Sequence, residues 1–295
     1  MEKTAYIFPG QGSQFVGMGK DLYEASAAAR RWMEQANELM DGELLTVMFE
    51  GDAERLKQTR YTQPAVYVHS LALVAAHPDA FSPAMVAGHS LGELTALAAV
   101  GVFSWADGLR LVRERALAMQ AACEVRPSTM AAVLGLDDEV VETVCAEVGP
   151  DVVPANYNSP GQVVISGTVE AVEAAVERLK ARGARRAVIL NVAGAFHSPL
   201  MEPARARLAT AIEATPFQAP QAPVYQNVTA EPSTDPDVIR ENLIQQLTSP
   251  VRWTQTIRNM IRDGATRFVE TGPGNVLRGL NRKIDRSVPT VSFPG

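Results

Sequence analysis

A serine stands between two glycines in Gly88-His89-Ser90-Leu91-Gly92, which matches the G-x-S-x-G pattern of serine nucleophiles. An apolar run precedes the motif and a helical pattern follows it, which is the setting such a nucleophile requires. The glycines permit a turn too sharp for larger residues, so the Ser90 hydroxyl is pushed out from the backbone. The Leu91 amide, at a helix N-terminus, is then placed to donate to a developing oxyanion. The structural alternative is a tight turn capped by a serine.

A serine nucleophile needs a base, and the chain holds only 4 histidines. His69 falls inside a helical pattern and His77 precedes a proline, so we expect both to be structural or solvated. His89 adjoins the serine, and because neighbouring side chains in a turn diverge, we expect it to support the turn. His197 lies in the stretch GAFHSP, where an inserted segment rejoins the main domain. His197 is therefore the expected partner of the serine.

The triad order of α/β-hydrolases places an acidic residue between the serine and the histidine. Asp107 and Glu114 lie on a predicted helix, and Asp137, Asp138 and Asp151 belong to the inserted segment. None of them sits on an obvious strand-end loop of the main domain. We therefore expect a backbone carbonyl to orient the histidine, which weakens a simple hydrolase interpretation.

Arg115 lies in the middle of an apolar helix face. In the predicted helix 105–123, Leu111, Arg115 and Met119 are spaced four apart on one side. A guanidinium keeps its proton, so its burial demands an anionic partner. Periodicity alone slightly favours an internal salt bridge. The functional alternative is a fork that holds a substrate carboxylate in bidentate geometry.

The glycine-rich stretch FPGQGSQ, residues 8–14, invites a phosphate-loop interpretation that fails. It lacks the G-x-x-x-x-G-K-[ST] pattern, and Phe15 occupies the position of the last glycine in G-x-G-x-x-G. As a loop after the first strand, it could instead supply a second oxyanion amide. The sequence contains no HExxH, CxxC or paired-carboxylate cluster, so we expect no catalytic metal.

The elements that must position these residues alternate between strand and helix, which favours a parallel sheet covered by helices. The expected strands are 4–8 and 84–87, and the expected helices are 22–40, 65–76 with Pro64 at its start, 91–100 and 105–123. Residues 128–192 have a different order of predicted strands and helices. Their expected strands are 129–136, 152–157, 162–166 and 186–192, and their helices 138–148 and 169–182. This βαββαβ order is that of a ferredoxin-like unit.

Composition and charge exclude several classes of protein. The 295 residues are 46% hydrophobic and 20% charged, as in ordinary globular proteins, and a net charge of -6 argues against broad nucleic-acid binding. Two cysteines imply no disulfide framework and fit a reducing compartment. The start of the sequence is unlike a secretory signal, and the most apolar stretch, 94–103, is too short to cross a bilayer. We therefore expect a cytoplasmic protein that binds no membrane.

Together these motifs resemble a known family, the malonyl-CoA:acyl carrier protein transacylases of fatty acid synthesis and the closely similar acyltransferases of polyketide assembly. The matching segments run from end to end in the family's order. They are FPGQGSQ (8–14), GHSLGE (88–93), RERALAMQ around Arg115, NSPGQVVISG (158–167), GAFHSPLM (194–201), QLTSPVRW (246–253) and ETGPG (270–274).

The resemblance implies an α/β fold with a hydrolase-like catalytic domain, residues 1–127 and 193–295, and an inserted ferredoxin-like subdomain, residues 128–192. It implies that Ser90 accepts malonyl from coenzyme A, with His197 as general base and later acid. In the family a main-chain carbonyl orients the histidine, and Gln246 is the matching residue here.

The resemblance also assigns the surroundings of the serine. The amides of Gln11 and Leu91 are the implied oxyanion hole, and Arg115 is implied to grip the free carboxylate of malonyl. Malonyl-preferring members tend to carry phenylalanine before the histidine, so Phe196 implies malonyl rather than methylmalonyl. One methyl group is worth only about 1–3 kcal/mol in a pocket, so this preference can be incomplete.

The implied partners are malonyl-CoA and an acyl carrier protein, and no resident cofactor is implied because the phosphopantetheine arm belongs to the carrier. Carrier proteins are acidic and so is this chain, so docking needs a local basic surface. The candidates are Arg178, Lys180, Arg182, Arg185, Arg186, Arg278, Arg282, Lys283 and Arg286. A solvated charged face is the alternative for each of them.

Two other functions stay open at the level of the sequence. A serine thioesterase or hydrolase could use the same scaffold, and it would lose its acyl group to water as fast as to a thiol. A docking module without catalysis is the other alternative, against which the presence of Ser90, His197 and Arg115 argues. The carrier could belong to fatty acid or polyketide synthesis.

Overall fold

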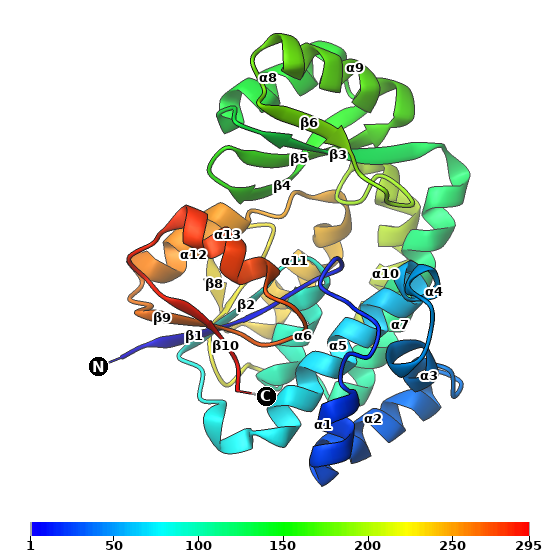
Figure 1. The fold of residues 1–295 in the computed structure, drawn as a ribbon, viewed down its shortest axis with the longest axis vertical. Helices are drawn as coiled ribbons and strands as arrows, with labels where there is room; N and C mark the ends of the chain where they lie inside the picture. The colour runs from blue at the N-terminus through cyan, green and yellow to red at the C-terminus, as the bar shows by residue number, and fades with distance from the viewer. Residues whose placement is uncertain (1, 295) are drawn as a thin grey trace.

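The larger part of the molecule is built around a six-stranded sheet with the order β10-β9-β1-β2-β7-β8, in a computed structural model that describes residues 2–294 (Figure 1). Its strands are β1 (Thr4–Phe8), β2 (Met85–Gly88), β7 (Val224–Tyr225), β8 (Pro232–Ser233), β9 (Arg267–Glu270) and β10 (Thr290–Ser292). All pairings are parallel except that of β7 with β8. The predicted α/β fold with a parallel sheet is thereby confirmed.

Helices cover both faces of this sheet. They are α1 (Lys20–Ala25), α2 (Ala27–Leu39), α3 (Leu44–Phe49), α4 (Ala53–Lys57), α5 (Thr59–Ala76), α6 (Leu91–Ala99), α7 (Trp105–Val125), α10 (Glu202–Ala214), α11 (Pro236–Gln245), α12 (Trp253–Arg262) and α13 (Val276–Ile284), with the 3-10 helices η1 (Pro78–Ala80), η2 (Pro199–Met201) and η3 (Gln246–Thr248).

Alternation along β1 separates two cores. Tyr6 and Phe8 join a large cluster with α2, α5, α6 and α7, whereas Ala5 and Ile7 join a smaller cluster with α12 and α13. Successive side chains of a strand point to opposite faces, so a strand buried on both sides must be apolar throughout. This explains the uninterrupted apolar run in the sequence.

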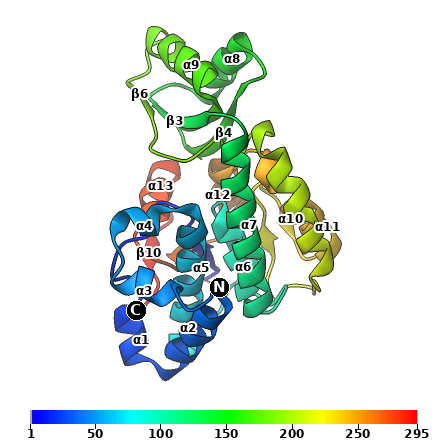
Figure 2. The same ribbon diagram turned by 90° about the vertical axis from the view of Figure 1, so that its right-hand side faces the viewer.

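Residues 128–189 form a second, four-stranded antiparallel sheet with the order β4-β5-β3-β6 at one end of the molecule (Figures 1 and 2). Its elements are β3 (Ser128–Leu134), α8 (Asp138–Val148), β4 (Val152–Ser159), β5 (Gln162–Thr168), α9 (Val169–Ala181) and β6 (Arg186–Ile189). The two helices pack on one face around a separate apolar cluster. The other face contributes Met130, Ala155 and Val164 to the core of the larger part.

The small sheet is joined to the larger part by more than its two connecting segments. The Tyr157 amide donates to the Val251 carbonyl at 2.9 Å, and the Val251 amide donates to the Ala155 carbonyl at 2.8 Å. Thr254 Oγ1 donates to the Tyr157 carbonyl at 3.1 Å. These bonds fix the edge strand β4 against the larger part, which makes one wall of the site rigid.

Two predicted helices differ from those in the structure. The predicted helix 22–40 is interrupted at Ser26, whose extended backbone separates α1 from α2 and whose side chain accepts the Ala29 amide as an N-cap. Pro64 lies inside α5 rather than at its start. α5 is buried along most of its length, so tertiary packing outweighs the hydrogen bond that the proline removes.

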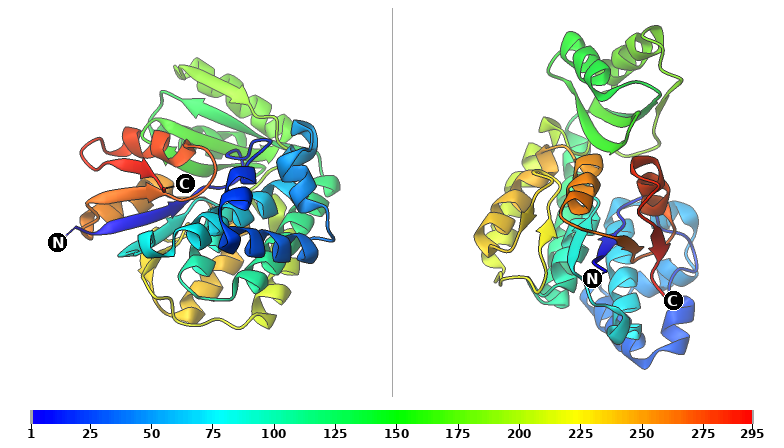
Figure 3. Two further views of the ribbon diagram at one scale, coloured as in Figure 1. Left: turned by 60° about the horizontal axis from the view of Figure 1, so that its bottom comes forward. Right: turned by 90° about the vertical axis from the view of Figure 1, so that its left-hand side faces the viewer.

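The ends of the chain lie away from the four-stranded sheet (Figure 3). No helix between residues 2 and 294 has the length and apolar character to cross a membrane. The carboxyl ends of β1 and β2 face the small sheet, since residues that follow both strands share a cavity with Met130 and Asn156.

Candidate active site

Ser90 occupies a strained turn between β2 and α6. Its φ of 53° and ψ of −109° are rare for a residue with a side chain, and such conformations store on the order of 1–3 kcal/mol each. The flanking glycines are required by contact: a Cβ on Gly88 would lie 1.9 Å from the carbonyl carbon of Gly92. A Cβ on Gly92 would lie 2.0 Å from the Phe8 carbonyl oxygen. The G-x-S-x-G spacing therefore follows from how closely three backbones approach.

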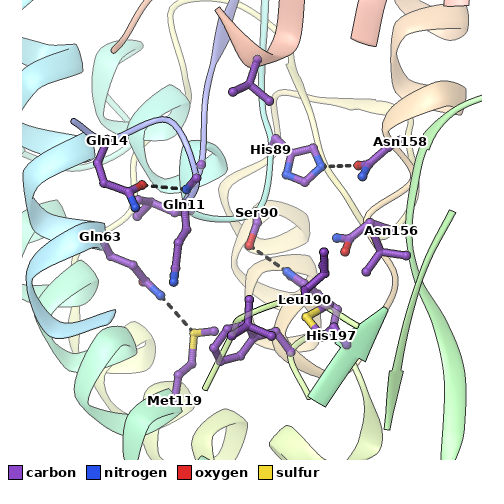
Figure 4. Close-up of a pocket in the computed structure, with 18 of the residues that line it drawn as sticks. Gln11, Gln14, Gln63, His89, Ser90, Met119, Asn156, Asn158, Leu190 and His197 are labelled. Atoms are coloured by element: carbon purple, nitrogen blue, oxygen red, sulfur yellow. Dashed lines mark hydrogen bonds between the residues drawn. The ribbon is translucent and has the colours of Figure 1, made fainter. Parts of the chain in front are cut away.

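The hydroxyl of Ser90 is hydrogen-bonded to His197, the partner expected from the sequence. Ser90 Oγ lies 2.7 Å from His197 Nε2, and His197 Nδ1 lies 3.0 Å from the main-chain carbonyl oxygen of Gln246 (Figure 4). A carbonyl only accepts, so Nδ1 carries the proton and Nε2 is free to accept one from the serine. Burial, together with the nearby charge of Arg115, lowers the pKa of His197 to about 3. The histidine is thus neutral at neutral pH, with Nε2 free to accept a proton.

Arg115 projects from α7 to the same hydroxyl. One terminal nitrogen donates to Ser90 Oγ at 3.0 Å and to Gln246 Oε1 at 3.1 Å, and the other donates to Gln63 Oε1 at 2.8 Å. The side chain is only 1% exposed, and its hydrogen-bond partners within residues 2–294 are all uncharged. Burial lowers its pKa to about 10, so it stays charged at neutral pH. The internal salt bridge that periodicity slightly favoured does not form.

A cavity of about 470 Å³ opens in front of these groups, between the large and small sheets. Figure 4 shows side chains from both parts of the molecule around it, among them Gln11 and Ser90 on one side and Asn156 on the other. The apolar part of the lining includes Met119, Met130, Val164, Leu190, Val192 and Phe196, with Leu91, Val276, Leu277 and Leu280. A cavity of this size, mostly apolar with a few convergent polar groups, is typical of a small-molecule site.

The loop after β1 lies directly against the turn of Ser90. Phe8 is paired with Gly88 in the parallel register, and a Cβ on Gly10 would lie 2.5 Å from the His89 carbonyl oxygen. Gln11 in this loop and Leu91 at the start of α6 both line the cavity beside the serine. The loop and the helix N-terminus therefore both border the nucleophile, as the predicted oxyanion hole requires.

The remaining histidines have structural surroundings. His89 Nε2 lies 2.8 Å from Asn158 Oδ1 on β4, so it links the turn to the small sheet rather than contacting the serine hydroxyl (Figure 4). His69 is buried in α5, and burial lowers its pKa to about 4. Between residues 2 and 294 the structure contains no cluster of three or more histidine, cysteine or acidic side chains suited to a metal ion.

Three functional side chains were missed in the sequence. Gln63 holds Arg115, Asn227 accepts the Ser90 amide, and Glu93 accepts the Asn227 amide. Glu93 could have been identified from the sequence, because a charged residue inside the apolar helix pattern 91–100 is the same anomaly that singled out Arg115. Gln63 and Asn227 could not, since neutral amides break no periodicity.

Comparison with known proteins gives concordant results. The family model described as "Acyl transferase domain" matches residues 5–289. The chain is 44% identical over 296 residues to a malonyl CoA-acyl carrier protein transacylase of Bacillus subtilis, covering 99% of this chain and 93% of the relative.

Two solved structures are similar over nearly the whole chain. An acyl-carrier-protein-S-malonyltransferase from Bartonella henselae superposes with a TM-score of 0.96 at 41% identity, covering 99% of this chain and 96% of that one. A malonyl-transacylase in complex with a type II PKS acyl-carrier protein superposes with a TM-score of 0.94 at 39% identity, covering 99% and 95%.

Proposed function

The chain belongs to the acyl transferase domain family, and from that premise we propose that it moves malonyl from malonyl-CoA to the phosphopantetheine thiol of an acyl carrier protein, through an ester on Ser90. The observation that carries this proposal is a buried cation beside the nucleophile. A terminal nitrogen of Arg115 lies 3.0 Å from Ser90 Oγ, and its hydrogen-bond partners between residues 2 and 294 are all uncharged. A buried guanidinium favours an anion beside it, and malonyl is an acyl group with a free carboxylate.

In the first half of the cycle, His197 Nε2 takes the hydroxyl proton of Ser90 and Oγ attacks the thioester carbonyl of malonyl-CoA. The oxyanion is stabilised by the amides of Gln11 and Leu91. The carbon–sulfur bond then breaks, and His197 gives its proton to the departing sulfur of coenzyme A. Malonyl is left as an ester on the serine, with its carboxylate on the Arg115 fork.

The second half reverses these roles with a different thiol. The phosphopantetheine thiol passes its proton to His197 and its sulfur attacks the ester carbonyl. The tetrahedral oxyanion returns to the same two amides, the carbon–oxygen bond to Ser90 breaks, and the serine regains a proton from His197. No bound cofactor or metal takes part in this proposed cycle. The Gln246 carbonyl does what a triad carboxylate does elsewhere, by holding the proton on Nδ1.

We infer further that residues 128–192 are a ferredoxin-like subdomain inserted into a hydrolase-like domain formed by residues 1–127 and 193–295. The strand order β4-β5-β3-β6 with both helices on one face supports this. A cytoplasmic location is part of the same proposal. Phe196 is 8% exposed and lines the cavity next to His197, which supports its role against an α-methyl group.

For carrier docking, the basic residues of the small subdomain fall into two groups. Arg178 and Arg182 donate to Glu147, and Lys180 pairs with Glu177, so these three are already engaged. Arg185 and Arg186 are exposed on the approach to β6, which favours them as contacts for an acidic partner.

A carrier of polyketide synthesis is the second candidate acceptor, because one of the similar solved structures holds such a carrier. The deciding experiment incubates the enzyme with labelled malonyl-CoA and either a fatty-acid or a polyketide carrier in its thiol form. We expect faster transfer to the fatty-acid carrier. Transfer only to the polyketide carrier would reassign the acceptor, and release of free malonate regardless of acceptor would indicate a thioesterase.

A further inference from the structure

The strained turn of Ser90 needs support from behind, on the side away from the cavity. A residue in this conformation persists only when surrounding groups hold it there, because relaxation would release the stored strain. The cavity side cannot supply that support, since it must admit substrates. The groups that contact the backbone of Ser90 from the interior are therefore the ones to identify.

Asn227 contacts the turn on both sides of His89. Its Oδ1 accepts the Ser90 amide at 2.8 Å, and its Nδ2 donates to the Gly88 carbonyl at 2.7 Å. The sheet explains this placement: Ala87 is paired with Tyr225 in the parallel register, so Asn227, two residues beyond Tyr225, comes level with His89, between the two peptide groups that it contacts. One planar carboxamide thus bridges the two peptide groups that the turn forces out of regular geometry.

Glu93 in turn fixes the main chain of Asn227. The Asn227 amide donates to Glu93 Oε2 at 2.6 Å, and Gln226 Nε2 donates to Glu93 Oε1 at 3.3 Å. The Asn227 carbonyl accepts the Arg252 amide at 3.1 Å. Glu93 and Asn227 are fully buried, and neither lines the cavity. Glu93 does not reach the cavity, so it cannot contact a substrate there. Its hydrogen bonds go to the segment behind Ser90, which indicates a structural role at the site.

We propose that Asn227 is a positioning residue that fixes the backbone of Ser90, and that Glu93 fixes the backbone from which Asn227 acts. From this backbone conformation the hydroxyl lies 2.7 Å from His197 Nε2. Loss of the bridge would let the turn relax, and the alignment of hydroxyl, imidazole and oxyanion amides would be lost with it. The proposal rests on the proposed function only in taking Ser90 as the nucleophile.

The test measures how fast Ser90 reacts with a small fluorophosphonate, which has neither a carboxylate nor coenzyme A. The serine oxygen attacks phosphorus, fluoride leaves, and His197 accepts the hydroxyl proton, so the rate reports the alignment of nucleophile and base alone. The variants are Asn227→Ala, Asn227→Asp and Glu93→Gln. The matched control is Asn281→Ala, because Asn281 is also buried and its side chain also both accepts and donates a hydrogen bond, from Trp253 and to Thr290, but it lies on α13.

We expect Asn227→Ala to label at least tenfold more slowly than the wild type, and Asn281→Ala to stay within twofold. Asn227→Asp keeps an acceptor for the Ser90 amide but loses the donor to Gly88, so we expect at least a threefold loss. If Asn227→Ala does not fold, the labelling rate of Asn227→Asp decides the test. Glu93→Gln keeps one acceptor oxygen and should fall between the wild type and Asn227→Ala. With malonyl-CoA as donor, kcat should fall and KM should change less than threefold, because Asn227 does not line the cavity.

Wild-type labelling rates in folded Asn227→Ala or Asn227→Asp would overturn the proposal, and so would an equal loss in Asn281→Ala. Failure of the proposed function looks different. In that case wild-type Ser90 reacts with the fluorophosphonate, the Asn227 variants react slowly, and malonyl-CoA leaves no adduct on any of them.

Discussion

Arg115 and Glu93 are both buried titratable groups on the neighbouring helices α7 and α6, yet they lie on opposite sides of Ser90. Arg115 borders the cavity and donates to the serine hydroxyl, and its hydrogen-bond partners between residues 2 and 294 are uncharged, although the nearby charge of Glu93 raises its pKa against the effect of burial. Glu93 lies behind the nucleophile and accepts from Gln226 and from the Asn227 amide. Burial alone therefore does not distinguish a binding group from a supporting one. The distinction lies in the partners, and in whether the charge borders empty space.

The largest expected effect tests the cavity side of this comparison. Arg115→Ala should lower kcat/KM for malonyl-CoA by about a thousandfold, because removing one member of a buried charged pair costs about 2–5 kcal/mol. Loading from acetyl-CoA should fall much less, since acetyl has no carboxylate. The matched control is Arg113→Ala on the same helix, where a half-buried arginine outside the cavity pairs with Asp41. Equal losses for both donors would return Arg115 to a purely structural role.

The buried Glu93 on the interior side is tested by how the free energy of unfolding changes with pH. Burial raises the pKa of Glu93 to about 7, whereas an unfolded chain gives about 4.3. Between these values the folded state binds a proton that the unfolded state has released, so this group makes the free energy of unfolding fall as pH rises. Glu93→Gln removes that fall, and its stability relative to the wild type should improve by about 2 kcal/mol from pH 5 to pH 8.

Urea unfolding at several pH values measures this difference, with Glu114→Gln as the control because Glu114 lies on α7 and pairs with Arg207 at the surface. A constant difference between Glu93→Gln and the wild type over that range would show that Glu93 is ionised as easily in the fold as in the unfolded chain.

A smaller effect concerns the acyl pocket. Phe196→Ala should reduce the preference for malonyl-CoA over methylmalonyl-CoA by about tenfold, because the space for one methyl group is worth about 1–3 kcal/mol. The ratio of kcat/KM values for the two donors measures it, and Phe217→Ala, which alters a ring packed on Phe103, is the control. An unchanged ratio in Phe196→Ala would remove this residue from the account of selectivity.

The smallest effect is a shift in a pH profile. The pKa of His197 lies near 3, first because of burial and then because of the Arg115 charge. Labelling of wild-type Ser90 by a fluorophosphonate should therefore persist well below pH 6.5, and in Arg115→Ala the midpoint should move to higher pH. A wild-type midpoint near 6.5 would mean that the imidazole is solvated as in a free peptide.

The sequence predicted these regions unequally. Ser90, His197 and Arg115 stood out because a sharp glycine turn, a scarcity of histidines and a charge on an apolar stripe each violate an ordinary pattern. In the structure the Ser90 hydroxyl lies within hydrogen-bond distance of both His197 and Arg115. Asn227 could not be found, because it follows a strand of two residues and acts through the register of β7 with β2. Such a contact depends on the tertiary arrangement rather than on a local pattern.

The fold shows the same division. Strands β1 and β2 were predictable from short apolar runs, and α8 from its acidic first turn. The position of Pro64 inside α5 was not, since burial on nearly all sides removes the amphipathic signal and packing overrides the proline. The lack of a suitable acidic residue predicted a backbone carbonyl beside His197, but the identity of Gln246 came only through resemblance to the family, because a main-chain group leaves no trace in residue type.

The measurement that tests the central claim most directly follows the acyl group on Ser90. Wild-type enzyme and Ser90→Ala are mixed with malonyl-CoA, and the adduct is located by mass spectrometry with and without a carrier protein in its thiol form. The account predicts a malonyl ester on Ser90 that persists without an acceptor, is discharged within seconds by the carrier, and is absent from Ser90→Ala. An ester that disappears equally fast in water alone, or an adduct on another residue, would contradict it.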